Sequence, residues 1–584
     1  MLVDPNSKAA PAPPADAADR LAEGLARWTE VTMPKAARRL GVDPGGVNRP
    51  RTPLDLKGHD FQRDVALPGE YPFTSWLYPT RAIRKGLGDT RIHRAGRYSG
   101  YGTSEDCREY YREQRQFGRL GGANIASDLP SQLGWDSDDP RAESEVGRVG
   151  VAIDSLRDFE IVYEAFTGDS DIDKVSSNWT INAPAAVYVA YYCALAQKRG
   201  IPIAKLRCTP QNDILKEYCA RGQYIFPVRP SLKLVKDIIE FMTREMPNSN
   251  SISICAGHIR YGGATTVQSL AFAFANAMAY VRLGLEAGLA VDDFVPRFTF
   301  RGFGDSSLDF YQGIASARAS RRIWARIMRE KFGARDDRTC MLRGGEHAWG
   351  NAYMKMSVQR PVNNIVRETI EAVICSLASG EIPGGQPFDE PLGLGHSLEA
   401  QQIARDITRI LQYEANIGAY LDPFAGSYVI ESLTDEIETD IRAEIDRIEA
   451  IGGPVAAVET GYYKNAIAES AWQAQKRFET REDIWVGVNA FNGPENIDVE
   501  IKRTPEYHQD LLETAEARQV AALKQLRRER SSADVTKALA GLRATARDNS
   551  ANLMPSLIKC AHAYATIGET CDVLRDVYGV EDLE

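Results

Sequence analysis

Short runs typical of β-strands alternate with longer helical patterns eight times between about residues 93 and 414. The strand candidates lie at 93–98, 122–127, 174–181, 204–208, 250–256, 296–302, 339–344 and about 377–384. The helical patterns lie at 105–117, 154–166, 184–199, 212–220 with 231–246, 265–287, 307–332, 361–376 and 397–414. A strand followed by a helix, repeated eight times, is what a (β/α)8 TIM barrel requires. We therefore expect an α/β chain built on such a barrel.

The barrel is expected at residues 76–425, between an N-terminal extended arm at 1–75 and a helical C-terminal region at 426–584. The first 20 or so residues are rich in Ala, Pro and Asp, a composition that buries too little to become ordered. A short amphipathic stretch follows at 18–26. Charged helical patterns fill the C-terminal region, and we expect them to pack on the barrel or on a partner.

The chain has 584 residues, 43% hydrophobic and 26% charged, which allows a large core and more than one domain. Its net charge of -10 argues against nucleic acid or an anionic membrane as a partner, since no net basic field would attract them. The apolar stretch at 271–281 is too short for a membrane span, which needs about 20 residues. The N-terminus lacks the pattern of a secretory signal, so we expect a cytoplasmic location.

Nine cysteines occur singly, without a C-x-x-C pair, so neither a disulfide framework nor a structural zinc site is indicated. The seven histidines form no H-x-x-x-H pair, and we expect no protein-bound catalytic metal.

The chemistry of such a barrel sits on the loops that follow its strands. The residues expected there are Tyr98, Ala126, Asp128, Asn182, Gln211, His258, the turn at 301–304, Glu346, His347 and Gln386. This set contains hydrogen-bond donors and a central histidine but no carboxylate cluster. It therefore differs from the paired acids of a glycosidase and from a metal triad.

Several segments, in a shared order, resemble the adenosylcobalamin-dependent acyl-CoA mutases, the family of methylmalonyl-CoA mutase. They are 71–74 (YPFT), 98–103 (YSGYGT), 134–140 (GWDSDDP), 150–155 (GVAIDS), 211–217 (QNDILKE), 250–254 (NSISI), 258, 296–297 (PR), 363–367 (NNIVR), 422–423 (DP), 426–428 (GSY) and 487–489 (GVN). The resemblance runs from about residue 70 to the C-terminus. It implies a barrel whose bore admits the pantetheine arm of a CoA thioester, and a radical 1,2-migration of the thioester group. The cofactor would perform this chemistry while the protein excludes water and holds the substrate.

The family's cobalamin module carries an Asp-x-His-x-x-Gly stretch, but no histidine of this chain has an aspartate two residues before it. The resemblance therefore implies a separate small cobalamin-binding subunit with that motif, and a heterotetramer as in the two-subunit mutases. The large chain alone is expected to be inactive.

Three residues carry the catalytic part of the resemblance. His258 matches the family histidine that contacts the carbonyl of the migrating thioester, where a donor can stabilise developing charge. Tyr98 and Arg221 match the pair that screens the radical and clamps the substrate carboxylate, a contact to which planar arginine is suited. A core histidine at 258 and a surface arginine at 221 are the alternatives.

Other positions match residues around the substrate and cofactor. Gln211 matches a residue near the thioester, and Glu371 resembles the residue near the adenosyl ribose. The positions that match CoA contacts are Tyr78, Thr80, Arg297 and Thr299. Arg297 would pair with a CoA phosphate, and an internal salt bridge is the alternative.

The acyl pocket departs from the family in three places. Gly257 stands where the family has an aromatic residue, and the loops at 344–349, with His347, and 382–386, with Gln386, are rewritten. Ala126 follows the methylmalonyl pattern, where hydroxyacyl relatives have aspartate, which disfavours a 2-hydroxyacyl substrate. We therefore expect a carboxylated branched acyl-CoA other than, or bulkier than, methylmalonyl-CoA. The alternatives are an isobutyryl- or 2-hydroxyisobutyryl-CoA-type mutase, a noncatalytic acyl-CoA-binding paralogue and a cobalamin-independent barrel enzyme.

Overall fold

The computed structural model describes residues 17–41, 43, 49–56, 58–79, 98–100, 102–116, 121–305, 307–344, 355–381, 386–392, 398–493 and 509–581. At Tyr98 it describes the backbone alone. All nine cysteines are buried free thiols.

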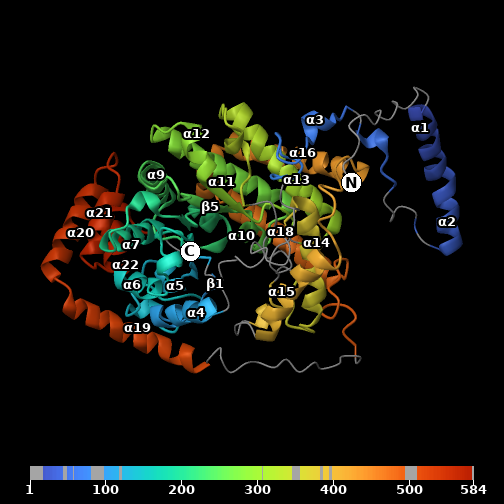
Figure 1. The fold of residues 1–584 in the computed structure, drawn as a ribbon. Helices are drawn as coiled ribbons and strands as arrows, with labels where there is room; N and C mark the ends of the chain where they lie inside the picture. Colours follow the sequence, from blue (N-terminus) through green and yellow to red (C-terminus); the bar gives the residue numbers. More distant parts are fainter. Residues whose placement is uncertain are drawn as a thin grey trace.

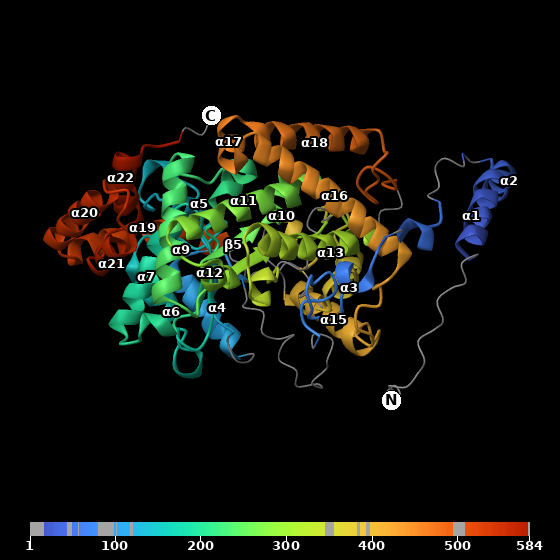
Figure 2. The same ribbon diagram turned by 90° about the horizontal axis from the view of Figure 1, so that it is seen from above.

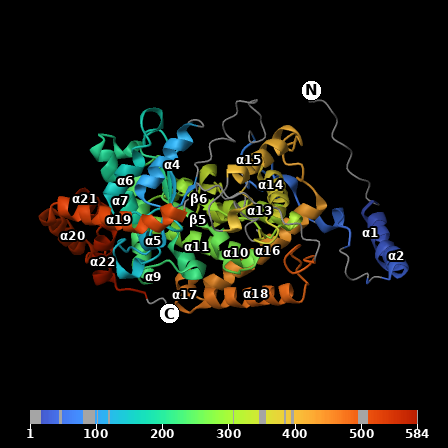
Figure 3. The same cartoon turned by 90° about the horizontal axis from the view of Figure 1, so that it is seen from below.

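Parallel strands form the centre of the molecule. The strands β1 (Tyr98–Ser99), β2 (Asn124–Ala126), β3 (Ser177–Thr180) and β4 (Cys208–Pro210) form one sheet in sequence order. Strands β5 (Ile252–Cys255) and β6 (Phe298–Arg301) form a second parallel pair, near the middle of the body in Figure 3.

Backbone hydrogen bonds link the two sheets into one series. The amide of Asn250 donates to the carbonyl of Cys208 at 2.8 Å, and that of Ser253 donates to Gln211 at 3.0 Å. On the far side of β6, the amide of Phe300 donates to the carbonyl of Arg343 at 3.0 Å. The α/β class is thus confirmed, with β1 to β6 following one another in parallel, while the described residues contain no closed ring of eight strands.

Three of the strand predictions need correction. The strand expected at 204–208 starts later than predicted, because Ile203–Lys205 form a 3-10 turn and β4 begins at Cys208. The strand expected at 339–344 begins in a 3-10 turn, Asp337–Cys340, although Arg343 does lie beside β6. The eighth strand, expected at about 377–384, is wrong at its start because helix α14 (Asn363–Ser379) continues through Leu377. Ala378 packs with Ile374 in an apolar cluster, which extends the helix, and Gly380 ends it with a left-handed φ of 74°. The segments 93–97 and 382–385 lie outside the described residues.

The predicted helices between the strands are largely confirmed. They are α4 (Ser104–Gln116), α6 (Leu156–Tyr163), α7 (Ala185–Lys198), α8 (Ile214–Lys216) with the π-turn Glu217–Arg221, α9 (Val228–Glu245), α11 (Thr266–Glu286), α13 (Phe310–Arg326), α14 and α15 (Leu398–Tyr413). Reciprocal hydrogen bonds between Ser155 and Asp158 and between Thr265 and Gln268 begin α6 and α11. The short helix α10 (Ala256–Tyr261) was not predicted.

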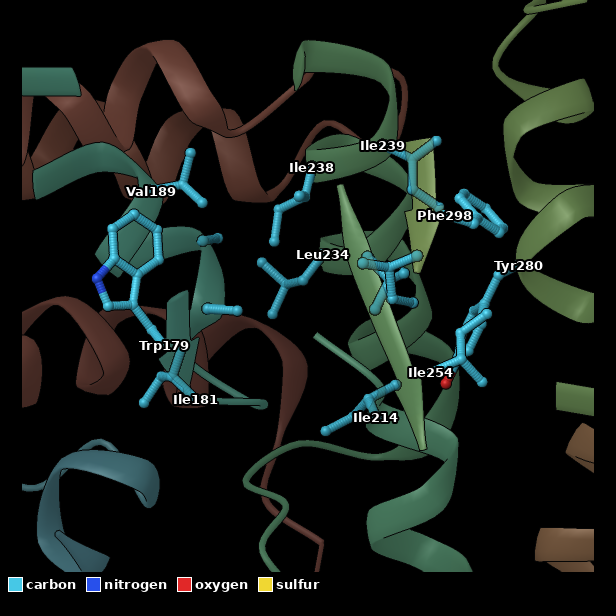
Figure 4. Packing of buried hydrophobic residues seen from close by; sticks show 14 of the residues in the cluster. Trp179, Ile181, Val189, Ile214, Leu234, Ile238, Ile239, Ile254, Tyr280 and Phe298 are labelled. Carbon is cyan, nitrogen blue, oxygen red and sulfur yellow. The ribbon is translucent and has the colours of Figure 1, made fainter. Parts of the chain in front are cut away.

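The main core lies where these helices cover the sheets. Figure 4 shows Leu234, Ile238 and Ile239 of α9 beside Ile254 of β5, with Trp179 of β3 on the other side. All four residues of β5 are buried, which is typical of a strand in a parallel sheet.

The C-terminal region is helical and packs on the strand-bearing part. Helix α16 (Tyr428–Ala450) lies along α11 and α13, followed by α17 (Gly453–Glu459) and α18 (Tyr462–Glu479) (Figure 2). Helices α19 (Gln509–Glu529), α20 (Ser532–Ala546), α21 (Met554–His562) and α22 (Ile567–Tyr578) gather beside α6 and α7 (Figure 1).

At the N-terminal end of the chain, α1 (Ala17–Arg27) and α2 (Met33–Leu40) lie apart from the body (Figure 1). None of the helices in the described residues is long and apolar enough to cross a membrane.

Buried arginines of α13 hold this arrangement together. Arg318 is fully buried and lies 2.6 Å from Asp422 and 2.5 Å from Glu431 of α16. Arg321 donates to the carbonyls of Phe73, Thr74 and Ala378, at 2.7 to 2.9 Å. One helix thereby fixes the segment before β1, the end of α14 and the start of α16.

Replacing Arg318 with methionine should therefore lower the free energy of unfolding by about 3–5 kcal/mol, because two buried carboxylates lose their cation. Arg112→Met is the matched control, since Arg112 pairs with Glu109 on the exposed face of α4 and that pair contributes under about 1 kcal/mol. Chemical denaturation of both variants measures the difference. Equal losses of stability in the two variants would contradict the claim that the buried ion pairs of Arg318 hold α13 and α16 together.

Candidate active site

The carboxyl ends of β4, β5 and β6 bring the polar side chains together. Gln211 directly follows β4, and α10 begins directly after β5, placing His258 one short turn beyond the strand. In the β5–β6 register Cys255 lies opposite Arg301, so these strands end at the same level. Chemistry in parallel α/β folds is carried at this edge.

A buried cation organises this edge. The Nζ of Lys216, whose side chain has no exposed surface, lies 3.2 Å from Oδ1 of Asn182 and 3.3 Å from Oε1 of Gln211, and it pairs with Glu217. Asn182 Nδ2 also donates to Gln211 Oε1 at 3.2 Å. The two amides and the ion pair therefore form one network.

Arg221 belongs to the same network. Its Nη1 lies 3.4 Å from Oε1 of Glu217, and its side chain is 25% exposed. Gly222, with a left-handed φ of 78°, ends the π-turn that carries Arg221. Arg221 is therefore anchored at the site and is not a freely solvated surface arginine.

His258 is partly buried among cations. Its Nδ1 is buried and has no hydrogen-bond partner in the described part of the protein. Burial lowers the pKa of His258 well below its usual range, and the charges of Lys216, Arg221 and Arg301 lower it further. A neutral imidazole with a free ring nitrogen can exchange one hydrogen bond with a bound ligand without adding charge.

Further polar atoms without partners lie along β5. The hydroxyls of Ser251 and Ser253 are buried, and neither has a hydrogen-bond partner among the described residues. Ser253 lies opposite Thr299 of β6, whose hydroxyl donates to the Ile252 carbonyl at 3.0 Å. Buried hydroxyls without partners are uncommon, and they suit an interior that receives a polar ligand.

A cavity of about 260 Å³ opens at the amino ends of β5 and β6, where Ser249, Ser251, Arg297 and Arg338 line it together with acidic and apolar residues. Burial lowers the pKa of Arg297, and the neighbouring charges of Arg343, Arg338 and Arg207 lower it further. In the parts of the chain that the structure describes, no carboxylate lies within salt-bridge distance of Arg297. The internal salt bridge considered for this arginine is thus not found there, and the cluster can accept a phosphate group.

Gly257 leaves room beside His258. A Cβ atom at this position would meet Gly302 Cα at 3.8 Å and Cys255 Sγ at 3.9 Å, which are ordinary contacts. Gly302 differs, because its φ is +69° and its Cβ would lie 2.8 Å from Gly257 Cα. The backbone segments around Gly257 and Gly302 therefore lie so close together that position 302 requires glycine, whereas position 257 permits a side chain.

Two carboxyl groups lie one turn apart on α14. Glu371 is buried and accepts from Cys375 Sγ at 3.4 Å, while burial and the neighbouring Glu368 raise its pKa well above the usual range. Burial raises the pKa of Glu368 to about 7, and its Oε2 accepts from the amide of Gln386 at 2.9 Å. Its Oε1 has no partner among the described residues. The raised pKa of Glu371 favours its protonated form, which can both donate a hydrogen bond to a sugar hydroxyl and accept one, so the pair fits an adenosyl ribose.

The remaining predicted positions are distributed as follows. Ala126 is buried at the end of β2, and Tyr78 and Gln386 are partly buried. Thr80, His347 and the side chain of Tyr98 lie outside the described residues. The described residues contain no group of three potential metal ligands.

Sequence reasoning missed several members of the site. Lys216 lies inside the recognised segment 211–217, but nothing in its spacing reveals the oxygens that it contacts. Glu368 could have been found, because it precedes Glu371 by three residues and so shares its helix face. Arg301 was expected only as part of a turn.

Comparison with known proteins places these features in one family. A family model described as methylmalonyl-CoA mutase matches residues 46–580. A probable mitochondrial methylmalonyl-CoA mutase of Caenorhabditis elegans is 36% identical over 92% of this chain and 69% of its own length. The 2-hydroxyisobutanoyl-CoA mutase large subunit of Aquincola tertiaricarbonis is 35% identical over 91% of both chains. The methylmalonyl-CoA mutase of Rhizobium meliloti is 36% identical over 93% of this chain and 74% of its own length.

The matches extend over nearly the whole chain, including the strand ends that hold Gln211 and His258. The chain therefore belongs to the methylmalonyl-CoA mutase family, isomerases that act on CoA thioesters with adenosylcobalamin.

Proposed function

We propose that this chain is the large subunit of an adenosylcobalamin-dependent mutase that moves the CoA thioester group of a carboxylated branched acyl-CoA, other than or bulkier than methylmalonyl-CoA. The observation that carries the proposal is the cationic strand edge. Lys216, Arg221 and Arg301 all influence the neutral His258, while Glu217 contacts both Lys216 and Arg221. Such an excess of positive charge favours an anionic acyl group.

The binding path for CoA is inferred from the unpartnered polar atoms. The nucleotide phosphates would lie against Arg297 and Arg338, with the pantetheine arm passing Ser251, Ser253 and Thr299 toward the carboxyl ends of the strands. Tyr78 and Thr80 complete the proposed CoA contacts. This path would run through the bore of a closed (β/α)8 barrel at 76–425, which we propose between the arm at 1–75 and the helical region at 426–584.

At the strand edge, each residue is assigned one task. His258 Nδ1 or Nε2 would donate a hydrogen bond to the thioester carbonyl as charge develops there, and Gln211 would hold the same group. Arg221 would clamp the substrate carboxylate through its two parallel N–H groups. Tyr98 would screen the radical from solvent. The acyl pocket would be walled by Ala126, Gly257, His347 and Gln386.

The cofactor would lie above this edge. When bound, adenosylcobalamin supplies the radical that abstracts hydrogen from the substrate. Glu371 would hold the adenosyl ribose, and Oε1 of Glu368, which has no partner in the described part of the chain, offers a second contact. A separate small subunit with an Asp-x-His-x-x-Gly stretch would carry the cobalamin in a heterotetramer, which agrees with the similarity to a protein described as a large subunit. A cytoplasmic location completes the proposal.

The second candidate is a 2-hydroxyisobutyryl-CoA-type mutase, favoured by the relative from Aquincola tertiaricarbonis. Ala126 weighs against it, because an apolar methyl group at the end of β2 cannot hydrogen-bond a substrate hydroxyl.

Arg221→Gln tests the carboxylate clamp. In the complex reconstituted with its cobalamin subunit, kcat/KM for a dicarboxylic acyl-CoA should fall by about 10- to 100-fold, the effect of losing hydrogen bonds to a charged group. Arg229→Gln is the control, because Arg229 lies on α9 with a side chain that is 72% exposed. Unchanged activity of Arg221→Gln on the dicarboxylic thioester would show that Arg221 does not bind the substrate carboxylate.

Gly257→Tyr tests the size of the acyl pocket. Because a Cβ atom fits at this position, the thermal unfolding midpoint should stay close to that of the unaltered protein. The added ring should lower activity on longer alkylmalonyl- or alkylsuccinyl-CoA esters more than on methylmalonyl-CoA. Faster turnover of methylmalonyl-CoA than of every longer ester by the unaltered complex would show that the pocket is not enlarged.

A further inference from the structure

Lys216 is the last residue of α8, and its fully buried side chain reaches the ends of β3 and β4. An ammonium group is costly to bury unless it is paired and hydrogen-bonded, and Lys216 satisfies both conditions through Glu217, Asn182 and Gln211. The tasks assigned above do not include this residue.

The ammonium determines which way two side-chain amides point. Lysine has three donors and no acceptor, so Asn182 and Gln211 must both turn their oxygen atoms toward it. The Asn182 Nδ2 then donates to the same Gln211 oxygen at 3.2 Å. Gln211 Oε1 thus accepts from two donors. The NH2 group of Gln211 points away from Lys216 and has no acceptor among the described residues.

We propose that Lys216 is a positioning residue, which orients Gln211 so that its NH2 group is presented to the carbonyl oxygen of a bound acyl-CoA thioester. The identity of the ligand rests on the proposed function. Glu217 connects the same ammonium to Arg221 at 3.4 Å. One buried ion pair therefore sets both the donor for the carbonyl and the clamp for the carboxylate.

A second effect of Lys216 reaches His258 through space. The charges of Lys216, Arg221 and Arg301 lower the pKa of this imidazole, and after burial Lys216 has the largest influence. Removing the ammonium should therefore raise the pKa of His258, which reports whether the charge of Lys216 is felt at this imidazole.

Lys216→Met in the full-length chain tests the inference. The ligand is propionyl-CoA, whose acyl group has no carboxylate, so Arg221 contributes no ion pair. Calorimetry should show affinity about three- to tenfold weaker, the effect of one misplaced hydrogen bond. NMR of 13C-labelled histidine, with the His258 signal identified by His258→Gln, should show a raised pKa.

Lys233→Met is the matched control, because Lys233 also loses a largely buried pair, with Asp237 at 2.8 Å, but lies on α9 away from the strand ends. It should affect neither measurement. In a Gln211→Leu background, Lys216→Met should weaken propionyl-CoA binding no further. If Lys216→Met does not fold, Lys216→Met with Glu217→Gln removes both charges together and is measured in the same way.

These measurements distinguish a wrong positioning role for Lys216 from a wrong proposed function. If Lys216→Met loses stability as Lys233→Met does, yet binds propionyl-CoA with the affinity of the unaltered chain and leaves the His258 titration unchanged, the positioning role is wrong. If the unaltered chain binds no CoA thioester, the proposed function itself is wrong.

Discussion

The backbone hydrogen bonds between β4 and β5 determine where the functional side chains lie. They run from Asn250 to Cys208 and from Ser253 to Gln211, and they hold two small parallel sheets in one series. Because parallel strands end at a common edge, Gln211 after β4 and His258 after β5 become neighbours. A shift of one residue in this register would turn the serines of β5 away from the interior.

The interior polar groups explain why this edge serves a ligand. Among the residues that the structure describes, Ser251, Ser253 and His258 leave buried atoms without partners, and Lys216 brings a charge into the same region. Each such group costs stability when no ligand is present. Elsewhere in the protein, the buried arginines of α13 join α14, α16 and the segment before β1.

Periodicity sufficed to predict β2, β3, β5, β6 and the long helices, because each places a recurring apolar face on the core, but it placed β4 too early in the chain. It failed at Leu377, where a helix keeps its apolar face to the end, and at α10, whose six residues are too few for a periodic signal. Motif resemblance located Gln211, Arg221 and His258. The Lys216 network and the space beside Gly257 depend on three-dimensional neighbours that sequence spacing does not contain.

The most direct test of the account is isomer formation by the assembled enzyme. The chain would be combined with a small subunit carrying Asp-x-His-x-x-Gly and with adenosylcobalamin, and then offered a panel of acyl-CoA esters. Chromatography coupled to mass spectrometry would separate products of unchanged mass. The account predicts conversion of a carboxylated branched acyl-CoA at a higher kcat/KM than methylmalonyl-CoA. Isomerisation of 2-hydroxyisobutyryl-CoA alone, or of no ester despite cofactor binding, would contradict it.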